Sequence, residues 1–262
     1  MPKRKQIRTN IAWSEIDRIT VKGYDLCGDI LGKLSLGDVA FLMLTDRLPN
    51  ERESRMFNAV AVTLVEHGLT PSSLAARLTY TGAPEAMQAA VAAGLCGLGS
   101  VFVGSMETAA RVLQEALPDS KTDADLPKLA KEAVAKLRAS KTLVPGIGHT
   151  LHKPVDPRAP RLFEIAKENG YYGGYCELMQ LIAEEAETSS GKVLPVNATG
   201  AIGAIASELG LPWQIVRGIG VLARSIGLVG HILEEMKDPM AYQVKMWAEE
   251  EATAHLRGKG RQ

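Results

Sequence analysis

Four parts of the chain hold nearly all the polar side chains that suit acid–base chemistry or anion binding. His149 follows a Gly-Ile-Gly turn, so its imidazole can face a reacting oxygen while the glycines let a ligand approach the backbone. Arg158 follows a proline at a predicted helix start, and its planar guanidinium suits a carboxylate. An ion pair with Asp156 or Glu164 is the alternative for Arg158. The four parts are Glu66-His67-Gly68, residues 146–158, Asn197-Ala198-Thr199, and Arg224.

Arg224 interrupts a very apolar helical run, and burial of an unpaired guanidinium is costly. We therefore expect Arg224 to meet an internal carboxylate or an anionic ligand. His231 lies seven residues further along a similar face, where a core or interface histidine is the simpler interpretation.

Two familiar kinds of site are not indicated. Asp119, Asp123 and Asp125 lack the Gly and Glu spacing of a calcium loop, so we interpret them as a solvated acidic loop. Gly97-Leu98-Gly99 lies in a helical run and follows no predicted strand, so it lacks the context of a dinucleotide-binding turn. No metal site and no nicotinamide site are expected.

Helices must position these side chains. Apolar residues recur every three or four positions through nearly every segment, and aromatic residues make up only 5% of the chain, which together predict an all-α fold. Ser35 and Asp38 resemble a capping box, and Gly68 suits the left-handed end of a helix. Helices are expected at residues 36–44, 51–66, 85–98, 126–140, 159–169, 175–188, 201–209 and 213–235, with another starting at 72 and a charged one from 241.

Composition limits the class of protein. The 262 residues are 46% hydrophobic and 23% charged, which is typical of a folded globular chain. Thirty basic residues offset thirty acidic ones, so no nucleic-acid partner is expected. The basic first residues are not followed by the apolar core of a secretion signal, and the apolar stretch 89–104 is too short and too weakly hydrophobic to cross a bilayer. It is interpreted as a closely packed internal helix, and no membrane partner is expected.

Three cysteines, Cys27, Cys96 and Cys176, follow no disulfide or zinc spacing. They are interpreted as buried small hydrophobes of a protein in the reducing cytoplasm.

The motif around His149 resembles the signature of the citrate synthase superfamily. Val144-Pro145-Gly146-Ile147-Gly148-His149, then Lys153 and Asp156-Pro157-Arg158, is similar to the family's PGxGH followed by DPR. Further similarity covers most of the chain and is closest to the short citryl-CoA lyases and the lyase module of ATP-citrate lyase. The other matching segments are Gly23-Tyr24-Asp25, 38–49, Glu66-His67 with 72–77, and 222–231.

The resemblance implies a large helical domain and a smaller mobile helical domain. We expect residues 1–105 and 200–262 in the large domain, and residues 106–199, with the CoA-binding loop, in the small one. It also implies a homodimer, or a dimer of dimers, that binds acyl-CoA and a dicarboxylate or tricarboxylate. The Ala/Gly-rich segment 86–104 and its neighbours are expected at the dimer interface. Coenzyme A enters as part of substrate or product, and no permanently bound cofactor is expected.

The resemblance also implies roles for individual residues. His67, Arg158 and Arg224 fall where the family binds the carboxylates and keto oxygen of oxaloacetate or citrate. His149 falls on the histidine that donates to, or takes a proton from, the carbinol oxygen. The remaining predicted site residues are Asn197 for substrate, Thr199 as a catalytic position, and Val144, Pro145, Gly146, Gly148, Lys153 and Lys192 for CoA.

Two family positions differ in this chain. Phe102 stands where the synthases have the histidine that stabilises the enol of acetyl-CoA, and this loss favours cleavage over synthesis. Thr199 stands where the family has the aspartate that exchanges a proton with the acetyl methyl group, and threonine is no carboxylate base. Glu66 or Glu234 are candidates to act in its place through water. The family's late arginine from the partner subunit has no match in residues 238–242.

The sequence thus predicts a carbon–carbon lyase for citryl-CoA or a related 3-hydroxy-3-carboxyacyl-CoA. His149 would take the hydroxyl proton, and an oxo acid such as oxaloacetate and an acyl-CoA enolate would form. One alternative is a citrate or methylcitrate synthase. The other is a non-catalytic acyl-CoA-binding protein.

Overall fold

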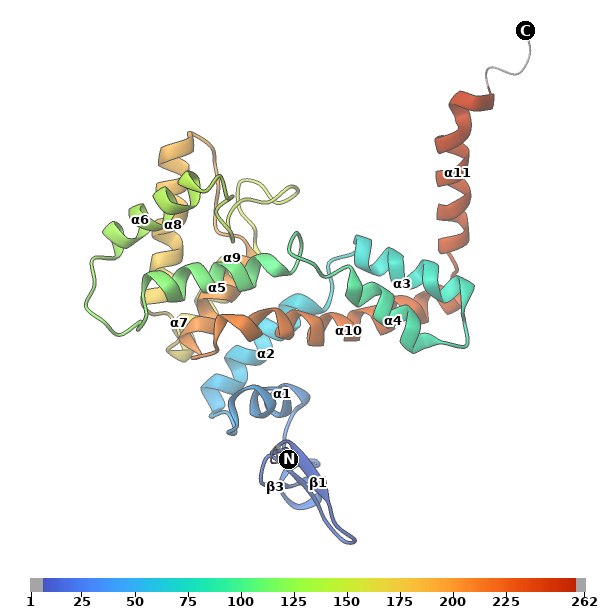
Figure 1. The fold of residues 1–262 in the computed structure, drawn as a ribbon, viewed down its shortest axis with the longest axis horizontal. Helices are drawn as coiled ribbons and strands as arrows, with labels where there is room; N and C mark the ends of the chain where they lie inside the picture. Colours follow the sequence, from blue (N-terminus) through green and yellow to red (C-terminus); the bar gives the residue numbers. More distant parts are fainter. Residues whose placement is uncertain (1–6, 258–262) are drawn as a thin grey trace, which may run out of the picture. The chain divides into compact units, whose positions relative to one another are not determined.

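The structure, a computed structural model, describes residues 7–257; residues 1–6 and 258–262, the ends of the predicted large domain, lie outside the described residues. Helices form most of the described chain, as the apolar periodicity predicts (Figure 1). In chain order they are α1 (Leu36–Thr45), α2 (Glu51–Val65), α3 (Pro71–Gly82), α4 (Met87–Cys96), α5 (Gly104–Ala116), α6 (Leu126–Ala139), α7 (Arg158–Asn169), α8 (Gly174–Ser190), α9 (Ala198–Glu208), α10 (Trp213–Lys237) and α11 (Ala241–Arg257).

A small antiparallel sheet precedes the helices. It contains β1 (Ala12–Ser14), β2 (Ile19–Val21) and β3 (Tyr24–Asp25) in the order β1-β2-β3, followed by the π-helical turn η1 (Leu26–Ile30). The two residues that join β2 to β3, Lys22 and Gly23, have φ of 51° and 90°. Positive φ at both positions is the requirement of a tight hairpin turn. The strands are too short to show an alternating pattern, so the sequence did not predict them.

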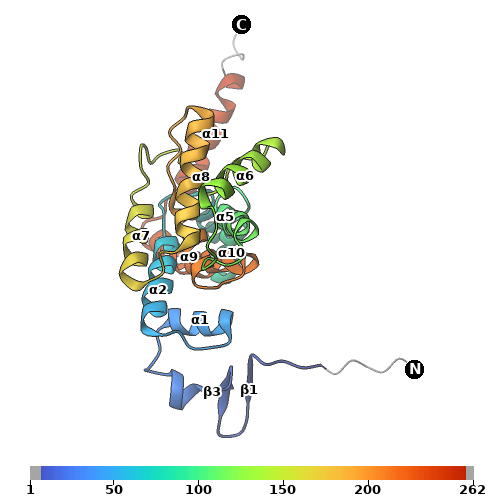
Figure 2. The ribbon, with the colours of Figure 1, turned by 90° about the vertical axis from the view of Figure 1, so that its left-hand side faces the viewer.

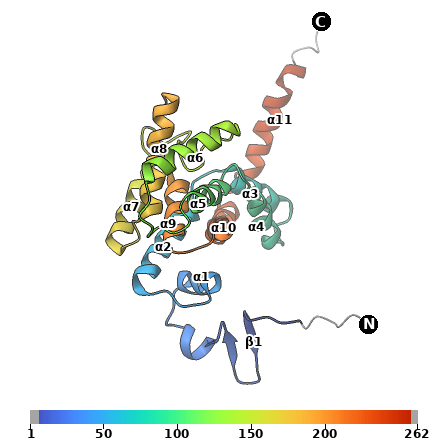
Figure 3. The same cartoon turned by 60° about the vertical axis from the view of Figure 1, so that its left-hand side comes forward.

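The chain divides into two compact units, which are described separately. Within the described residues, unit 1 comprises residues 7–60 and 108–216, and unit 2 comprises residues 61–107 and 217–257. In unit 1, α8 packs on α6 and α9, and α7 also packs on α9 (Figure 2). In unit 2, α3 packs on α4 and contacts α11 (Figure 3). The predicted large and small domains have other boundaries than these two units. The prediction concerns domains that move relative to each other, which the two units do not test, so it stays a prediction.

Helix α9 is the buried centre of unit 1. Every residue from Ala198 to Ser207 except Thr199 is buried. Small residues at many of these positions let neighbouring helices and loops approach closely. The N-terminus of α9, where the Asn197-Ala198-Thr199 segment lies, is therefore held by packing on several sides.

Local signals set several helix boundaries. Ser35 and Asp38 form the predicted capping box of α1: Ser35 Oγ accepts from the Asp38 amide at 3.2 Å, and Asp38 accepts from the Ser35 amide at 2.9 Å. Gly68 has a φ of 76° just after α2, as expected. Helix α9 begins at Ala198, three residues before the expected start, because Asn197 is its N-cap.

Two sequence interpretations were wrong. Only Cys176 is buried, whereas Cys27 and Cys96 are exposed. The segment 89–104 is not one internal helix: α4 ends at Cys96, and of its residues only Ala90 and Gly94 are buried. Weakly apolar Ala and Gly carry little information about burial, which explains the second error.

Helix α10 is long and apolar enough to cross a membrane by length and composition alone. Core helices of soluble proteins meet the same test, and 44% of its most apolar window is buried within the described chain. The expected absence of a membrane partner stays a prediction.

Candidate functional site

The loop at residues 144–149 is built against the start of α9. Gly146 has a φ of 82°, and a Cβ added to it would lie 2.5 Å from the Cα of Gly200. The Asn197 amide donates to the Gly146 carbonyl at 3.0 Å, and the Gly148 amide donates to the Pro195 carbonyl at 2.8 Å. The glycine at 146 is therefore required for the backbone crossing with α9, a constraint independent of any ligand.

Asn197 joins this loop to the first turn of α9. Its Oδ1 accepts from the amides of Thr199 and Gly200 at 3.0 and 3.1 Å, and its Nδ2 donates to the Gly148 carbonyl at 2.6 Å. The Thr199 hydroxyl also donates to Asn197 Oδ1, at 2.7 Å. The hydroxyl proton of Thr199 is thereby committed to an internal acceptor.

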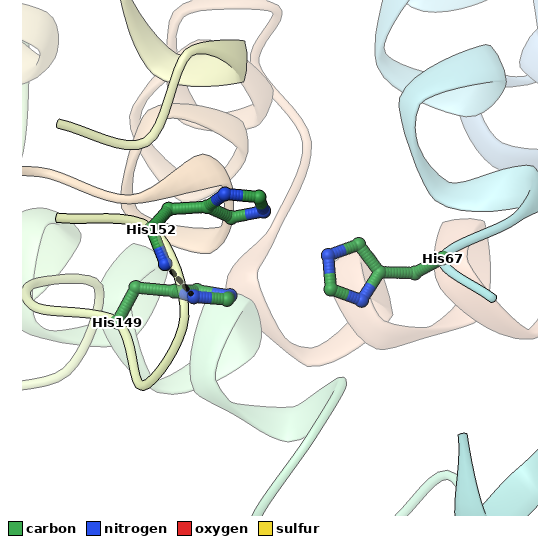
Figure 4. Close-up of side chains that lie close together, drawn as sticks. All are labelled: His67, His149 and His152. Atoms are coloured by element: carbon green, nitrogen blue, oxygen red, sulfur yellow. Dashed lines mark hydrogen bonds between the residues drawn. The ribbon is translucent and has the colours of Figure 1, made fainter. Parts of the chain in front are cut away.

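His149 has a defined tautomer. Its Nδ1 accepts from the backbone amides of Leu151 and His152, at 3.1 and 3.0 Å. Figure 4 shows the bond from the His152 amide. An imidazole nitrogen that accepts two N–H groups carries no proton, so the neutral ring carries its proton on Nε2. Burial lowers the pKa of His149, and the neighbouring His152 and Arg158 lower it further. The charge of Asp156 acts in the other direction, but the pKa remains below its usual value. His149 therefore presents a neutral Nε2–H donor.

His152 lies over His149 in the same loop. The ring centroids are 4.5 Å apart and the planes are inclined by 32° (Figure 4). Both rings are half-buried. His67, also drawn in Figure 4, belongs to unit 2 and is considered with it.

Arg158, at the start of α7, is held by a buried carboxylate. Asp156 is fully buried; its Oδ1 accepts from Arg158 Nε at 2.9 Å and its Oδ2 accepts from Arg158 Nη2 at 2.8 Å. Oδ2 also accepts from the Ala198 amide at 2.9 Å, which joins α7 to the N-terminus of α9. The ion pair anticipated as an alternative for Arg158 thus exists. Arg158 remains 28% exposed, with its Nη1 edge outside the bidentate pair.

The protonation of Asp156 follows from these contacts. Burial would raise its pKa, but the Arg158 guanidinium and the amides of Ala198 and Arg158 lower it to about 2. Asp156 is therefore ionised at neutral pH, and the Asp156–Arg158 pair carries no net charge. This pairing fixes the direction of Arg158 and reduces the field that it presents to an anion.

In unit 2, Arg224 is buried on α10 as predicted. Its Nε donates to the Leu64 carbonyl at 3.2 Å, and its Nη1 lies 3.5 Å from Thr70 Oγ1. The charge of Arg224 also contributes to a lowered pKa at Glu66. Arg224 therefore lies at the end of α2 beside the Glu66-His67 segment, where its hydrogen-bond partners are a carbonyl and a hydroxyl and Glu66 acts through its charge. The predicted contact with a carboxylate or an anionic ligand stays a prediction.

Glu66 positions the backbone of His67. Its Oε1 accepts from the His67 amide at 2.8 Å, and its Oε2 lies 3.0 Å from His231 Nε2. Burial would raise the pKa of Glu66, but His231, the His67 amide and the charge of Arg224 lower it below its usual range. Glu66 is thus a carboxylate in contact with the His67 amide and His231, while the His67 side chain is exposed.

A buried arginine, Arg77, completes this cluster of charged residues in unit 2. Its Nε donates to His231 Nδ1 at 3.1 Å, its Nη1 donates to Glu235 Oε2 at 3.0 Å, and its Nη2 pairs with Glu234. Because Nδ1 of His231 accepts, its Nε2 carries the proton toward Glu66. The chain of contacts runs from Arg77 through His231 and Glu66 to the His67 amide, which makes His231 a core histidine as expected.

The other predicted residues lie in less constrained places. Lys153 and Lys192 are exposed, while Val144, Pro145 and Gly148 are half-buried. Phe102, in unit 2, is 52% exposed and carries no side-chain donor. Glu234 is largely exposed and is paired with Arg77.

Sequence reasoning missed three residues that organise the site. Arg77 was treated only as the end of a helix start, Asp156 only as a partner of Arg158, and His152 was not considered. The signal for His152 was its spacing of three from His149 in a turn. Arg77 had no signal, because its partners lie more than 150 residues away.

Comparison with known proteins decides the family. Residues 7–244 match the citrate synthase C-terminal domain. The chain belongs to the citrate synthase family. The citryl-CoA lyase from Hydrogenobacter thermophilus is 36% identical, superposes with a TM-score of 0.80, and is matched over 88% of its length by 89% of this chain.

Two further relatives share less sequence with this chain. Citrate synthase from Heyndrickxia coagulans is 26% identical over 78% of this chain and 53% of its own length. The chain spans about half the length of the first curated relatives it matches. ATP citrate lyase from Methanothrix soehngenii, solved in complex with citrate and coenzyme A, shares the fold with a TM-score of 0.73 at 23% identity, over 90% of this chain and 40% of that one.

Proposed function

We propose that this chain is a carbon–carbon lyase that cleaves citryl-CoA, or a related 3-hydroxy-3-carboxyacyl-CoA, into an oxo acid such as oxaloacetate and acetyl-CoA. The observation that carries the proposal is the similarity to the Hydrogenobacter thermophilus citryl-CoA lyase over nearly the full length of both chains. The family also includes ATP citrate lyase solved with citrate and coenzyme A, which supports substrates of this class.

In this reaction His149 acts as a hydrogen-bond donor. Its Nδ1 is occupied by two backbone amides, so the Nε2–H group would donate to the substrate's tertiary oxygen as that oxygen becomes a carbonyl. Of the two roles that the resemblance implied, this tautomer supports donation over removal of a proton. A neutral imidazole with a lowered pKa can play this part across the neutral range.

Arg158, Arg224 and His67 would hold the carboxylates of the oxo-acid portion. Arg158 would use the edge that its pair with Asp156 leaves outside, and Arg224 is already directed by Leu64. Asn197 and Thr199 act mainly as the tie between loop and helix, and Thr199 would orient a water at most. In this assignment the N-terminus of α9 contributes mainly by orienting the substrate, and Thr199 does not transfer a proton.

Coenzyme A would bind as substrate and leave as product, with no permanently bound cofactor. The backbone of Val144, Pro145, Gly146 and Gly148 would face its adenine end. Lys153 and Lys192 are exposed and free to follow the phosphates.

Condensation to citrate or methylcitrate is the second candidate, favoured by the relatives named citrate synthase. Phe102 counts against it, since a phenylalanine cannot donate to a thioester enol. A non-catalytic acyl-CoA-binding protein is the third outcome, and it would show binding without turnover.

We further propose a homodimer, or a dimer of dimers, in the cytoplasm. Five large apolar side chains on α10 are exposed at alternating spacings of four and three, a pattern that forms one helix stripe. They are Leu222, Ile226, Val229, Leu233 and Met236. A second copy of the chain would bury this stripe together with the exposed face of neighbouring α4. The three free cysteines are consistent with a reducing compartment.

The test is cleavage of citryl-CoA by the purified chain, followed as oxaloacetate through a coupled dehydrogenase. We expect turnover in the wild type and a loss of about 10²–10³-fold in His149→Ala, the effect of removing one oxyanion donor. His255→Ala, on exposed α11, serves as the matched control and is expected to retain full activity. Tight binding of CoA esters without oxaloacetate release would refute the lyase proposal and favour a binding protein.

A further inference from the structure

The proposed cleavage leaves one proton without an acceptor. The tertiary hydroxyl must lose its proton when the carbon–carbon bond breaks, and the acyl-CoA enolate must gain one at carbon. Thr199 cannot serve, because its hydroxyl donates to Asn197 and threonine is not a base at neutral pH. His149 cannot serve in its observed tautomer, because Nδ1 accepts two amides and Nε2 already carries the proton.

The turn that fixes His149 also fixes a second imidazole beside it. The His149 ring caps the turn by accepting from the amides two and three residues later, and the second of these amides is that of His152. The bond at His152 N sets the backbone direction at this residue. Its side chain then lies over the His149 ring, at 4.5 Å between centroids (Figure 4).

This arrangement suits a pair with one donor and one acceptor. Two imidazoles at this distance repel each other when both are charged. The other charged groups that act on His149 in unit 1 are Asp156 and Arg158, which are paired with each other. The His152 ring, by contrast, lies directly over the His149 ring.

We propose that His152 is a catalytic residue, the general base that takes the substrate's hydroxyl proton and returns it to the carbon of the departing acyl group. The inference rests on the proposed function. Nothing in the family resemblance assigns a role to this position.

The step balances without any further reactant. A His152 nitrogen takes the proton of the tertiary hydroxyl, the oxygen forms a carbonyl, and the carbon–carbon bond breaks with its electron pair on the thioester's α-carbon. The resulting imidazolium returns the proton to this α-carbon, which gives the acyl-CoA. His149 keeps its Nε2 proton throughout and donates a hydrogen bond to the same oxygen.

His152→Gln tests the role cleanly. Glutamine retains the backbone amide that holds His149 Nδ1, so the donor stays in place while the base is lost. We expect kcat for citryl-CoA cleavage to fall about 10²–10⁴-fold with KM changed less than about threefold, since general-base catalysis contributes on this scale. His255→Gln, an exposed histidine of α11, is the matched control.

Two further readouts separate catalysis from a structural role. The limb of the kcat–pH profile that reports the base is expected to disappear in His152→Gln. Added imidazole is expected to restore part of the rate in His152→Ala, whose short side chain leaves space for it. A variant with kcat within threefold of wild type overturns the role, and so does a slow variant with an unchanged pH profile and no rescue. A wild type that does not cleave citryl-CoA overturns the proposed function along with this role, whereas an active His152→Gln enzyme overturns the role alone.

Discussion

Replacing Asp156 with asparagine changes how stability depends on pH. The carboxylate has a pKa of about 2 in the fold against 3.8 for the unperturbed group, because Arg158 and the Ala198 amide bind its charged form. At about 1.4 kcal/mol per unit, this shift corresponds to about 2 kcal/mol of unfolding free energy. A depressed pKa stabilises the fold above pH 4. This contribution falls by about 1 kcal/mol between pH 7 and pH 3 and is lost as the pH passes below 2.

The assay is urea unfolding of wild type and Asp156→Asn at pH 7, 5, 4 and 3, monitored by helical circular dichroism. The variant is expected to be less stable at pH 7, and the difference from wild type is expected to shrink by about 1 kcal/mol at pH 3. Asp123→Asn, in the exposed connection before α6, is the control and should follow wild type at every pH. A difference between wild type and Asp156→Asn that stays constant from pH 7 to pH 3 would refute the reasoning.

Three other changes test separate parts of the structure. Gly200→Ala places a Cβ 2.2 Å from a backbone oxygen of the 144–149 loop and should cost about 1–3 kcal/mol of stability, whereas Gly82→Ala, with open space around it, should cost nothing; urea melts of the two variants decide this. Arg77→Met leaves buried carboxylate charge unpaired and should lower the unfolding free energy by about 3–5 kcal/mol, and a melt within 1 kcal/mol of wild type would contradict the network described. Val229→Lys should convert the proposed dimer to monomer in sedimentation velocity, while Leu143→Lys, exposed in unit 1, should not; a dimeric Val229→Lys protein would exclude the α10 stripe as its interface.

Local chemistry explains what could be predicted from the sequence. The capping box at Ser35 and the glycine after α2 act over a few residues, so their types alone indicate a helix start and a helix end. The same holds for the loop before His149, where Pro and Gly interrupt the helical period. The motif also pointed to Arg158 and to its alternative partner Asp156, and the structure contains this pair.

Long-range pairing explains what could not be predicted. Arg77 and Glu235 are 158 residues apart in the sequence, and Gly146 contacts Gly200 only through backbone atoms. Neither contact leaves a periodic or local signal in the sequence. The tautomer of His149 depends on amide directions within a turn, which residue types do not specify. Exposure of Cys27 and Cys96 likewise depends on packing, and composition alone gave the wrong answer.

The most direct test of the central claim compares the two directions of the reaction on one preparation. Initial rates are measured for release of oxaloacetate from citryl-CoA and for release of free CoA from acetyl-CoA plus oxaloacetate. We predict rapid cleavage and a rate of free-CoA release at least about 10²-fold lower, because free CoA appears only when the citryl-CoA thioester is hydrolysed after condensation, and the proposed cleavage includes no such hydrolysis. Efficient formation of citrate and free CoA, with slow cleavage of citryl-CoA, would contradict the account and identify the chain as a synthase.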